Sequence, residues 1–340
     1  MNKLLSIIIP VYNNRKYLER CFESVVHLDS NITEVIIIDD GSTDGSSIVC
    51  DCYANQYNNV IVKHLENGGV SKARNTGIRI ATAKYTMFLD SDDYFDLDEL
   101  KKVLILLKNQ SYDSYICNYS YVNMNGQTLY NSDLKQGEIT NVDACNGLIF
   151  GKIRFAIGSF IVNSGISKRI MFNEQCKYGE DIEYIYKCLI NSKNIIILDN
   201  YIYNYVNNTN SAMNTLTVNR FDVVFARIRF YEYVCSNFSQ YEELKENLIE
   251  YNIPEAISQL ITNLSYDGID YKSLSLYIDR KGINDIIDDL LDININTEFE
   301  HVFQEWKNNP FEFYIRRRLK CIKDTTKHSI YLILTRLMKK

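Results

Sequence analysis

Short apolar runs alternate with helical patterns along the first hundred residues of the chain. The runs are rich in Ile, Val and Leu, as expected of buried strands, and cover residues 4–9, 35–38, 60–64 and 85–89. Stretches with apolar residues on one helical face follow the first three runs, at residues 18–25, 46–57 and 68–81. Strands and helices that alternate in short steps predict an α/β fold, with a mostly parallel sheet covered by helices on both faces.

The pattern changes beyond residue 97. Residues 97–108 predict a helix, and two strand-like segments flank Asn125-Gly126, which is a strong signal for a two-residue hairpin turn. Another helix is expected from about Glu180, followed by a strand at residues 195–198. From about residue 217 onward the pattern is helical, without strand signals. We therefore predict an α/β domain over residues 1–216 and a helical C-terminal region over residues 217–340.

Length and cysteine content narrow the class of protein. A chain of 340 residues is long enough for one large α/β unit and an appended piece. Its nine cysteines form no CxxC pair and are odd in number, which argues against a disulfide framework and favours a reducing compartment. The first apolar run is too short for a signal peptide, and none is long enough to span a bilayer, so we predict a cytoplasmic protein.

The charge is distributed unevenly along the chain. Residues 314–340 hold nine Lys or Arg against one Asp, a local charge of +8. Because the whole chain has a net charge of −6, the residues before them carry −14. An acidic body argues against nucleic acid as a partner. The basic tail also carries apolar residues at helical spacing, so it predicts either peripheral contact with the inner face of the plasma membrane or a helix packed on the acidic body.

Polar residues follow three of the predicted strands. Residues 10–13 read Pro-Val-Tyr-Asn, residues 39–42 read Asp-Asp-Gly-Ser, and residues 90–93 read Asp-Ser-Asp-Asp. Ligands of open parallel sheets bind beyond the carboxyl ends of the strands, so we expect these three segments to meet at one edge of the sheet.

Two of these segments carry carboxylates with a candidate chemistry. Asp90 and Asp92, one residue apart, have the oxygen ligands that suit Mg²⁺ or Mn²⁺ bound through a diphosphate. The alternative is a solvated acidic turn before the helix at residue 97. Asp40 has a carboxylate that can accept the imide N–H of uracil, and the alternative is simple turn chemistry in Asp-Gly-Ser-Thr-Asp.

Two further sites lie at the starts of helices. Arg74 and Asn75 sit near a positive helix end, where a guanidinium can help to hold a diphosphate, and the alternative is a surface arginine. Glu180 and Asp181 follow Tyr178-Gly179 and offer a general base for a sugar hydroxyl. The alternative is an acidic pair that stabilises the helix N-terminus.

The order and spacing of five motifs resemble those of family 2 glycosyltransferases. The resemblance covers about residues 3–210. The motifs are SIIIPVYN at 6–13, IIIDDGSTDGS at 36–46, KARNTG at 72–77, FLDSDD at 88–93 and YGED at 178–181.

The resemblance implies a GT-A fold, a UDP-sugar donor and a role for each matching residue. The nucleotide-binding set it implies comprises Pro10 and Tyr12 at the base, Asn13, Asp40 at the uracil, Arg74, Asn75, Asp90 and Ser91. Asp92 corresponds to the main protein ligand of Mn²⁺ or Mg²⁺. Asp181 corresponds to the catalytic base, and Glu180 orients it or contacts the acceptor.

The implied reaction is an inverting transfer of one sugar to a hydroxyl of a glycan or lipid-linked saccharide, in the synthesis of a capsule, exopolysaccharide or lipopolysaccharide. Processive relatives carry a Gln-x-x-Arg-Trp motif, whereas Trp306 lies in Gln-Glu-Trp-Lys. Residues 201–211 hold fewer basic groups than relatives have near the pyrophosphate. One alternative is a sugar-1-phosphate nucleotidyltransferase, although the expected glycine-rich loop is missing from residues 10–15. The other is a non-catalytic sugar-binding relative, which would lack Asp92 or Asp181.

Overall fold

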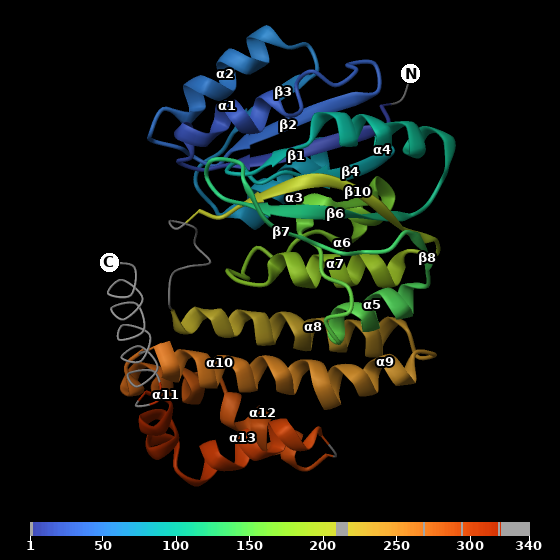
Figure 1. The fold of residues 1–340 in the computed structure, drawn as a ribbon. Helices are drawn as coiled ribbons and strands as arrows, with labels where there is room; N and C mark the ends of the chain where they lie inside the picture. Colours follow the sequence, from blue (N-terminus) through green and yellow to red (C-terminus); the bar gives the residue numbers. More distant parts are fainter. Residues whose placement is uncertain (1–2, 209–216, 268, 294, 319, 321–340) are drawn as a thin grey trace, which may run out of the picture. The chain divides into compact units, whose positions relative to one another are not determined.

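The computed structural model of the chain describes residues 3–208, 217–267, 269–293, 295–318 and 320. The chain divides into two compact units, Met1–Asn210 and Ser211–Lys340 (Figure 1). The division falls close to the boundary that the sequence pattern predicts. The assignment of nucleotide-sugar binding and catalysis to the first unit stays a prediction.

One mixed sheet forms the centre of the first unit. Its strands are β1 Leu5–Val11, β2 Thr33–Asp39, β3 Val60–His64, β4 Tyr85–Phe88, β5 Tyr94–Phe95, β6 Ser114–Val122, β7 Thr128–Asn131, β8 Gly137–Ile139, β9 Phe160–Asn163 and β10 Ile195–Val206. They run in the order β3-β2-β1-β4-β9-β6-β10-β5, with β7 beside β6 and β8 beside β10. The pairs β1–β2, β1–β4, β2–β3 and β6–β10 are parallel and the others antiparallel. The predicted α/β class is confirmed.

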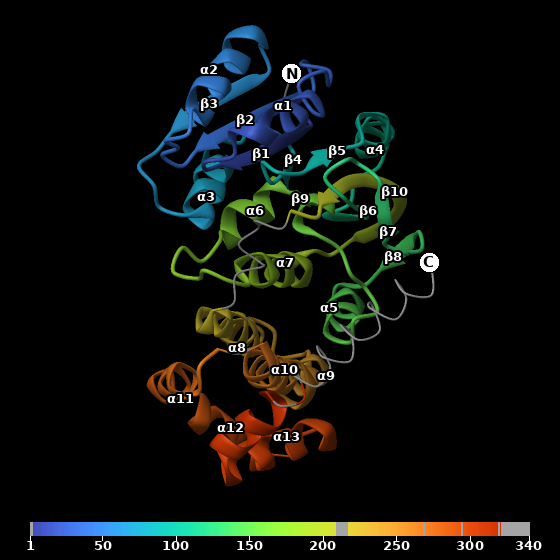
Figure 2. The same ribbon diagram turned by 60° about the vertical axis from the view of Figure 1, so that its left-hand side comes forward.

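Helices cover both faces of this sheet (Figures 1 and 2). They are α1 Arg15–Glu23, α2 Ser46–Gln56, α3 Val70–Ile80, α4 Leu97–Asn109, α5 Asn141–Ile149, α6 Ser164–Ile170 and α7 Glu180–Asn191, with a short 3₁₀ turn η1 at Ile157–Ser159. Buried residues of α1, α2 and α4 pack with Ile7 and Ile9 of β1. On the opposite face, Gly77 of α3 lies so close to Ile8 that a Cβ there would be 2.3 Å from its Cγ2.

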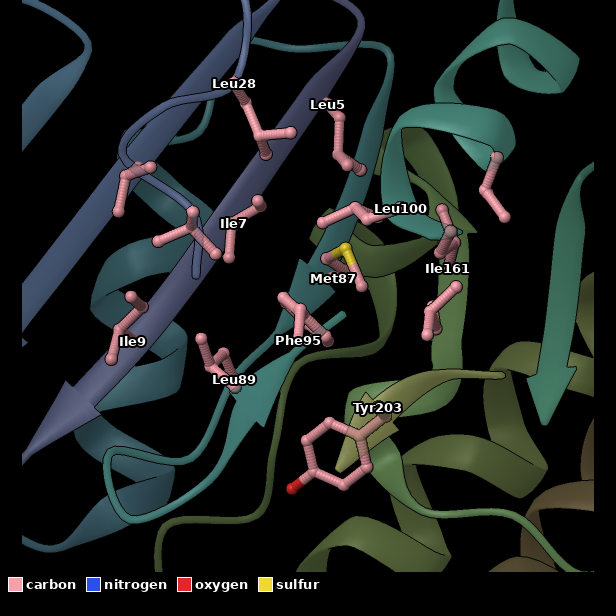
Figure 3. Close-up of a cluster of buried hydrophobic side chains, with 14 of the residues drawn as sticks. Leu5, Ile7, Ile9, Leu28, Met87, Leu89, Phe95, Leu100, Ile161 and Tyr203 are labelled. Atoms are coloured by element: carbon pink, nitrogen blue, oxygen red, sulfur yellow. The ribbon is translucent and has the colours of Figure 1, made fainter. Parts of the chain in front are cut away.

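Strands β1 and β2 read as nearly continuous apolar runs because both of their faces are buried. Every residue of β1 and β2 is buried, and Figure 3 shows Leu5, Ile7 and Ile9 side by side along β1. Pro10 fits inside central strand β1 for a specific reason. The last hydrogen bond between β1 and β4 runs from the Leu89 N–H to the Ile8 carbonyl. Pro10, which has no N–H to donate, lies beyond this bond, so the pairing of β1 with β4 does not need its N–H.

The described part of the second unit is helical, as the pattern predicts. Its helices are α8 Asp222–Asn237, α9 Glu242–Asn247, α10 Ile253–Asp267, α11 Tyr271–Arg280, α12 Ile283–Leu291 and α13 Thr297–Asn308, with short turns η3 Val218–Phe221 and η4 Leu248–Asn252, and residues 310–318 are also helical. Trp306 is 1% exposed in the core of this unit, and its indole N–H donates to Asn284 at 3.1 Å. Within the described ranges, no helix is both long and apolar enough to cross a bilayer.

The described part of the basic tail packs against its own unit. Arg316 pairs with Glu312, Arg317 lies 3.4 Å from Glu305, and Arg318 donates to the Tyr266 carbonyl at 3.1 Å. For Arg317 and Arg318 the structure therefore matches the alternative of a packed helix, whereas the closest ion pair of Arg316 lies within its own helix. The rest of the predicted tail, residues 321–340, lies outside the described residues.

Candidate active site

The loops after β1, β2 and β4 lie together at one edge of the sheet, as expected from their positions after neighbouring strands. Asn13 has a positive φ of 50°, and its amide oxygen accepts the Thr43 N–H at 2.7 Å in the loop after β2. Asn14 donates its side-chain amide to Ser91 in the loop after β4, at 2.7 Å. Two adjacent asparagines therefore fasten the central loop to both of its neighbours. Ser91 is buried by this contact.

The residues predicted to line the base pocket differ in exposure. Tyr12 is 50% exposed, so its ring is available to a ligand, whereas Pro10 is buried inside β1. Asp40 is only 3% exposed, and its two carboxylate oxygens accept the backbone N–H groups of Gly68 at 2.9 Å and Gly69 at 2.7 Å. In this structure Asp40 therefore anchors the loop that leads into α3.

Asp39, the residue before Asp40, holds the loop after β2 together. Its carboxylate accepts hydrogen bonds from Ser42 N–H at 3.0 Å and Ser47 Oγ at 2.7 Å, and pairs with His64 Nδ1 at 2.7 Å. Burial opposes ionisation, but the bonds from Ser42, His64 and Ser47 outweigh it and lower the pKa of Asp39. The pKa of His64 is raised in turn by the bond to Asp39.

Asp90 and Asp92, the two carboxylates of the predicted metal motif, have different surroundings. Asp90 forms an ion pair with Arg74 at 2.8 Å. The Asp92 side chain accepts a long contact of 3.4 Å from Asn208, while Arg20 donates to the Asp92 backbone carbonyl at 3.2 Å. Burial, and then the charge of Asp90, raises the pKa of Asp92. The Asp92 carboxylate is thus buried close to the negative charge of Asp90, while the charge of Arg20 has a smaller, opposing effect on it.

Arg74 links the loop after β4 to the start of α7. Besides Asp90, its guanidinium donates to Glu180 at 2.9 Å, and the side chain is only 5% exposed. Burial opposes the charged form, but the charges of Asp90 and Glu180 raise the pKa of Arg74 above its usual value. The guanidinium also lies over the Phe172 ring, 5.3 Å from its centroid. The surface-arginine alternative is therefore wrong for Arg74.

Asn75 points away from Asp90 and fixes the segment between α6 and α7. Its amide oxygen accepts the Phe172 N–H at 2.7 Å, and its amide nitrogen donates to the Phe172 carbonyl and to Glu174, both at 2.9 Å. The Phe172 ring then stacks on Tyr184 of α7 at a centroid distance of 4.0 Å. Asn75 is 2% exposed. Its contacts therefore position the aromatic surface beneath Arg74.

Glu180 and Asp181 form the first turn of α7, after Gly179 in the left-handed conformation. Burial and the neighbouring Asp181 raise the pKa of Glu180 to about 7, against the opposing charge of Arg74. Burial likewise raises the pKa of Asp181, although Arg74 opposes it. One oxygen of Asp181 accepts the Ile182 N–H at 2.8 Å, and no described side chain donates to this carboxylate. Asp181 is thus a raised-pKa carboxylate with acceptor capacity to spare.

The donor set suits a divalent cation that also binds phosphate. Within the described ranges, no group of three or more His, Cys, Asp or Glu side chains is arranged as a metal site. Mg²⁺ is commonly held by one or two carboxylates together with substrate phosphates and water, so Asp92 with Asp90 is a sufficient protein contribution. Burial, and then the charge of Asp90, raise the pKa of Asp92, and a cation bound there would offset the negative charge of the two carboxylates.

The structure adds residues that the motifs did not identify. Asn14, Phe172 and Asn208 contact residues of the predicted set, and Tyr203 contacts Asp93 next to it. Tyr203 and Val206 of β10 donate to Asp93, the residue after the metal motif, and the Val206 bond is 2.7 Å long. Only Asn14 had a sequence signal, its position beside Asn13. The other contacts depend on pairings across more than 90 residues.

Comparison with known proteins identifies the family. Residues 6–166 match the family described as glycosyl transferase family 2. The chain is 30% identical over 242 residues to glycosyltransferase GlyG of Streptococcus pneumoniae, covering 67% of this chain and 77% of GlyG. It is 33% identical over 208 residues to minor teichoic acid biosynthesis protein GgaA of Bacillus subtilis, covering 56% of this chain and 44% of GgaA.

A solved structure extends the likeness in fold to nearly the whole chain. The crystal structure of S. aureus TarS 1–349 in complex with UDP-GlcNAc matches with a TM-score of 0.73 at 20% identity, over 94% of this chain and 92% of TarS 1–349. The sheet order, the helices on both faces and this match give the first unit the GT-A fold. The chain belongs to glycosyl transferase family 2 and is a glycosyltransferase.

Proposed function

We propose that the protein transfers a single sugar from a UDP-sugar to a hydroxyl of a cell-surface glycan or lipid-linked saccharide, with inversion at the anomeric carbon. The observation that carries this proposal is the buried Arg74, which is bonded both to Asp90 of the metal motif and to Glu180 beside the candidate base. A donor diphosphate held near Asp90 and an acceptor hydroxyl near Asp181 would then meet at one site.

The donor assignment is supported by two features. TarS 1–349, which shares this fold, has been crystallised with UDP-GlcNAc. In the present chain the exposed Tyr12 ring lies beside the loops that Asn13 and Asn14 hold together, and we assign it to the uracil base. We assign Asp40 to the same nucleotide site, where it fixes the backbone of Gly68 and Gly69. We assign Asn75 to positioning Phe172 rather than to direct nucleotide contact.

The reaction we propose needs no enzyme nucleophile. The acceptor oxygen attacks the anomeric carbon while the bond from that carbon to the diphosphate oxygen breaks, and UDP leaves with the bonding electrons. Asp181 accepts the proton of the attacking hydroxyl, a role that suits a carboxylate of raised pKa with free acceptor capacity. Glu180, held by Arg74, keeps the first turn of α7 in place. Attack from the face opposite to the leaving group inverts the configuration.

Asp92, with Asp90, is the proposed protein contribution to a Mn²⁺ or Mg²⁺ site. When bound, such a cation would offset the charge that develops on the departing diphosphate. Arg74 also brings positive charge to this region, but its two ion pairs with carboxylates already engage it. Residues 201–208 add no Lys or Arg, and Arg20, which donates to the Asp92 carbonyl, brings a further positive charge to this region.

The acceptor class rests on the relatives. GgaA is named for minor teichoic acid biosynthesis, which is the synthesis of a cell-surface polymer. We propose that the present chain also acts on a surface polysaccharide or its lipid-linked precursor, in the cytoplasm at the inner face of the plasma membrane. Membership of a glycosyltransferase family leaves the nucleotidyltransferase alternative without support. The presence of both Asp92 and Asp181 argues against a non-catalytic relative.

A screen of UDP-sugars tests the proposal. UDP release would be measured for each sugar nucleotide with Mn²⁺, with Mg²⁺ and with a chelator, and binding of UDP would be followed by calorimetry. The expected result is cation-dependent UDP binding and UDP release from one or a few donors. If UDP fails to bind under every condition, the donor assignment is wrong.

A further inference from the structure

Three tyrosines from three neighbouring strands form a row near Asp92. Tyr205 of β10 is paired in register with Tyr121 of β6, and Tyr121 is paired with Tyr130 of β7. Their rings stack in the same order, with centroids 5.6 Å apart for Tyr121–Tyr205 and 4.9 Å apart for Tyr121–Tyr130. Tyr119 meets Tyr130 edge-to-face at 6.2 Å. We refer to Tyr121, Tyr130 and Tyr205 as the tyrosine row.

The inner end of the tyrosine row is connected to the candidate active site. Val206, the residue after Tyr205, donates its N–H to Asp93, and Asn208 contacts Asp92. The hairpin that carries Tyr130 is fastened to the same place, because Arg20 donates both to the Asp92 carbonyl at 3.2 Å and to the Met124 carbonyl at 3.3 Å. The carboxylates of Asp93, Asp90 and Asp92 add to the effect of burial in raising the pKa of Tyr205.

Tyr130, at the outer end of the row, is more exposed than a role in stabilising the sheet explains. Cross-strand aromatic pairs stabilise a sheet, but they do so best when they are covered. Tyr130 is 51% exposed, and strand β7 carries no charged residue, although edge strands are usually protected by charge. The exposed Met124, 45% accessible, lies in the same hairpin. An uncharged exposed apolar edge beside a reaction centre is typical of a binding surface.

We propose that the tyrosine row is the acceptor subsite, where a pyranose ring of the acceptor glycan stacks on Tyr130. This inference rests on the proposed function, because it names the substrate of that same site. A pyranose has an apolar C–H face and a rim of hydroxyls, and a tyrosine ring with its hydroxyl presents the matching combination of apolar face and polar edge. The row carries no charge that would select an anion. Its connection to Asp92 would leave the acceptor beside the donor diphosphate.

Saturation-transfer difference NMR tests the subsite without turnover, with methyl β-glucoside and methyl β-N-acetylglucosaminide as probes in the presence of UDP and Mn²⁺. We expect signals on the pyranose C–H protons with the wild-type protein. Tyr130→Leu keeps an apolar side chain on β7 but removes the ring, and it should weaken binding about three- to tenfold, the range expected for loss of one aromatic contact. Tyr130→Phe keeps the ring and should bind within about twofold of wild type.

Leu129→Ala is the matched control. Leu129 is also 51% exposed, and it adjoins Tyr130 on β7 with its side chain on the opposite face. Its replacement should leave saccharide binding unchanged. The subsite is refuted if neither probe binds the wild-type protein, if Tyr130→Leu binds as wild type does, or if Leu129→Ala loses as much affinity. Loss of UDP affinity in Tyr130→Leu equal to the loss of saccharide affinity would assign the row to the donor instead.

The experiment separates this inference from the proposed function. Failure of the wild-type protein to bind UDP would count against the proposed function. Normal UDP binding, together with saccharide binding that does not depend on Tyr130, would count against the tyrosine row alone.

Discussion

Arg74 and Glu180 form a buried ion pair of 2.9 Å although 106 residues separate them in the chain. The pair joins the second turn of α3 to the first turn of α7, and the second N–H arm of the Arg74 guanidinium reaches Asp90 at 2.8 Å. One side chain therefore sets the spacing between the predicted metal motif and the predicted base. The predictions below start from this connection.

Replacing Arg74 with methionine should destabilise the protein by about 3–5 kcal/mol, the usual cost of leaving buried charges without their partner. Glu180 and Asp90 would both lose their cation. Arg79→Met on the same helix is the control, because Arg79 is 61% exposed and lies 3.7 Å from Glu174, a pair expected to contribute at most about 1 kcal/mol. Urea denaturation of both variants gives the comparison, and similar losses in the two would contradict a structural role for the Arg74 network.

Asp92→Ala should abolish the cation dependence of UDP binding, because the proposed site loses its main protein ligand. Calorimetric titration of UDP with Mn²⁺ and with a chelator measures this dependence. Asp133→Ala, at an exposed aspartate, is the control and should behave as the wild type does. Cation-dependent binding that survives in Asp92→Ala would move the metal site elsewhere.

Asp181→Asn should lower kcat on the order of a hundredfold or more and leave UDP affinity nearly unchanged, since an amide keeps the shape but cannot accept the proton. UDP release in the presence of an acceptor measures kcat, and calorimetry measures the affinity. Asp143→Asn, in the first turn of α5, controls for the loss of a carboxylate at a helix start. A parallel loss of UDP affinity in Asp181→Asn would place this residue at the nucleotide.

His64 should make stability depend on pH. Its pKa is raised in the folded state, so its stabilising pair with Asp39 is fully present below the unfolded-state pKa of about 6.5 and is lost as the pH rises through the folded-state value. The difference in unfolding free energy between wild type and His64→Gln should therefore be larger at pH 6 than at pH 9. His301→Gln, at an exposed position of α13, should show no such trend. A constant difference across this range would exclude the His64 effect.

The basic tail can be tested without removing any described residue of the helical core. Phe313 is buried and Arg317 pairs with Glu305, so a truncation before Tyr314 would remove residues that pack on this unit. Truncation after Lys320 instead removes a segment with five Lys or Arg and one Asp.

Anionic lipid attracts such segments by about 1 kcal/mol for each basic residue near the surface. We expect the full chain to float with anionic vesicles at low salt and not with neutral ones, and the truncated chain to float with neither. Flotation that is absent in the full chain, or unchanged by truncation, would exclude membrane docking by residues 321–340.

The sequence alone was sufficient for the α/β class, for strands β1 to β4 with their neighbouring helices, and for the family. Strands β5, β8 and β9 and helices α5 and α6 had no predicted counterpart. The apolar run at residues 4–9 predicts a strand because it is too short for a helix and rich in isoleucine, and the carboxyl ends of β2, β1 and β4 then meet at one edge of the sheet. The ordered motifs located Asp92, Arg74 and Asp181 without any coordinates. These conclusions depend on local periodicity and on chain order, both of which the sequence contains.

Only the tertiary structure decided what each polar group bonds to. Asn75 lies beside Arg74 in the sequence but faces Phe172, because successive helical residues point about 100° apart and only one of them can face the loop after β4. The tyrosine row likewise needs the registers of β10, β6 and β7, which pair residues as far apart as 121 and 205. Such partners are fixed by long-range packing, which the local pattern of residues does not specify.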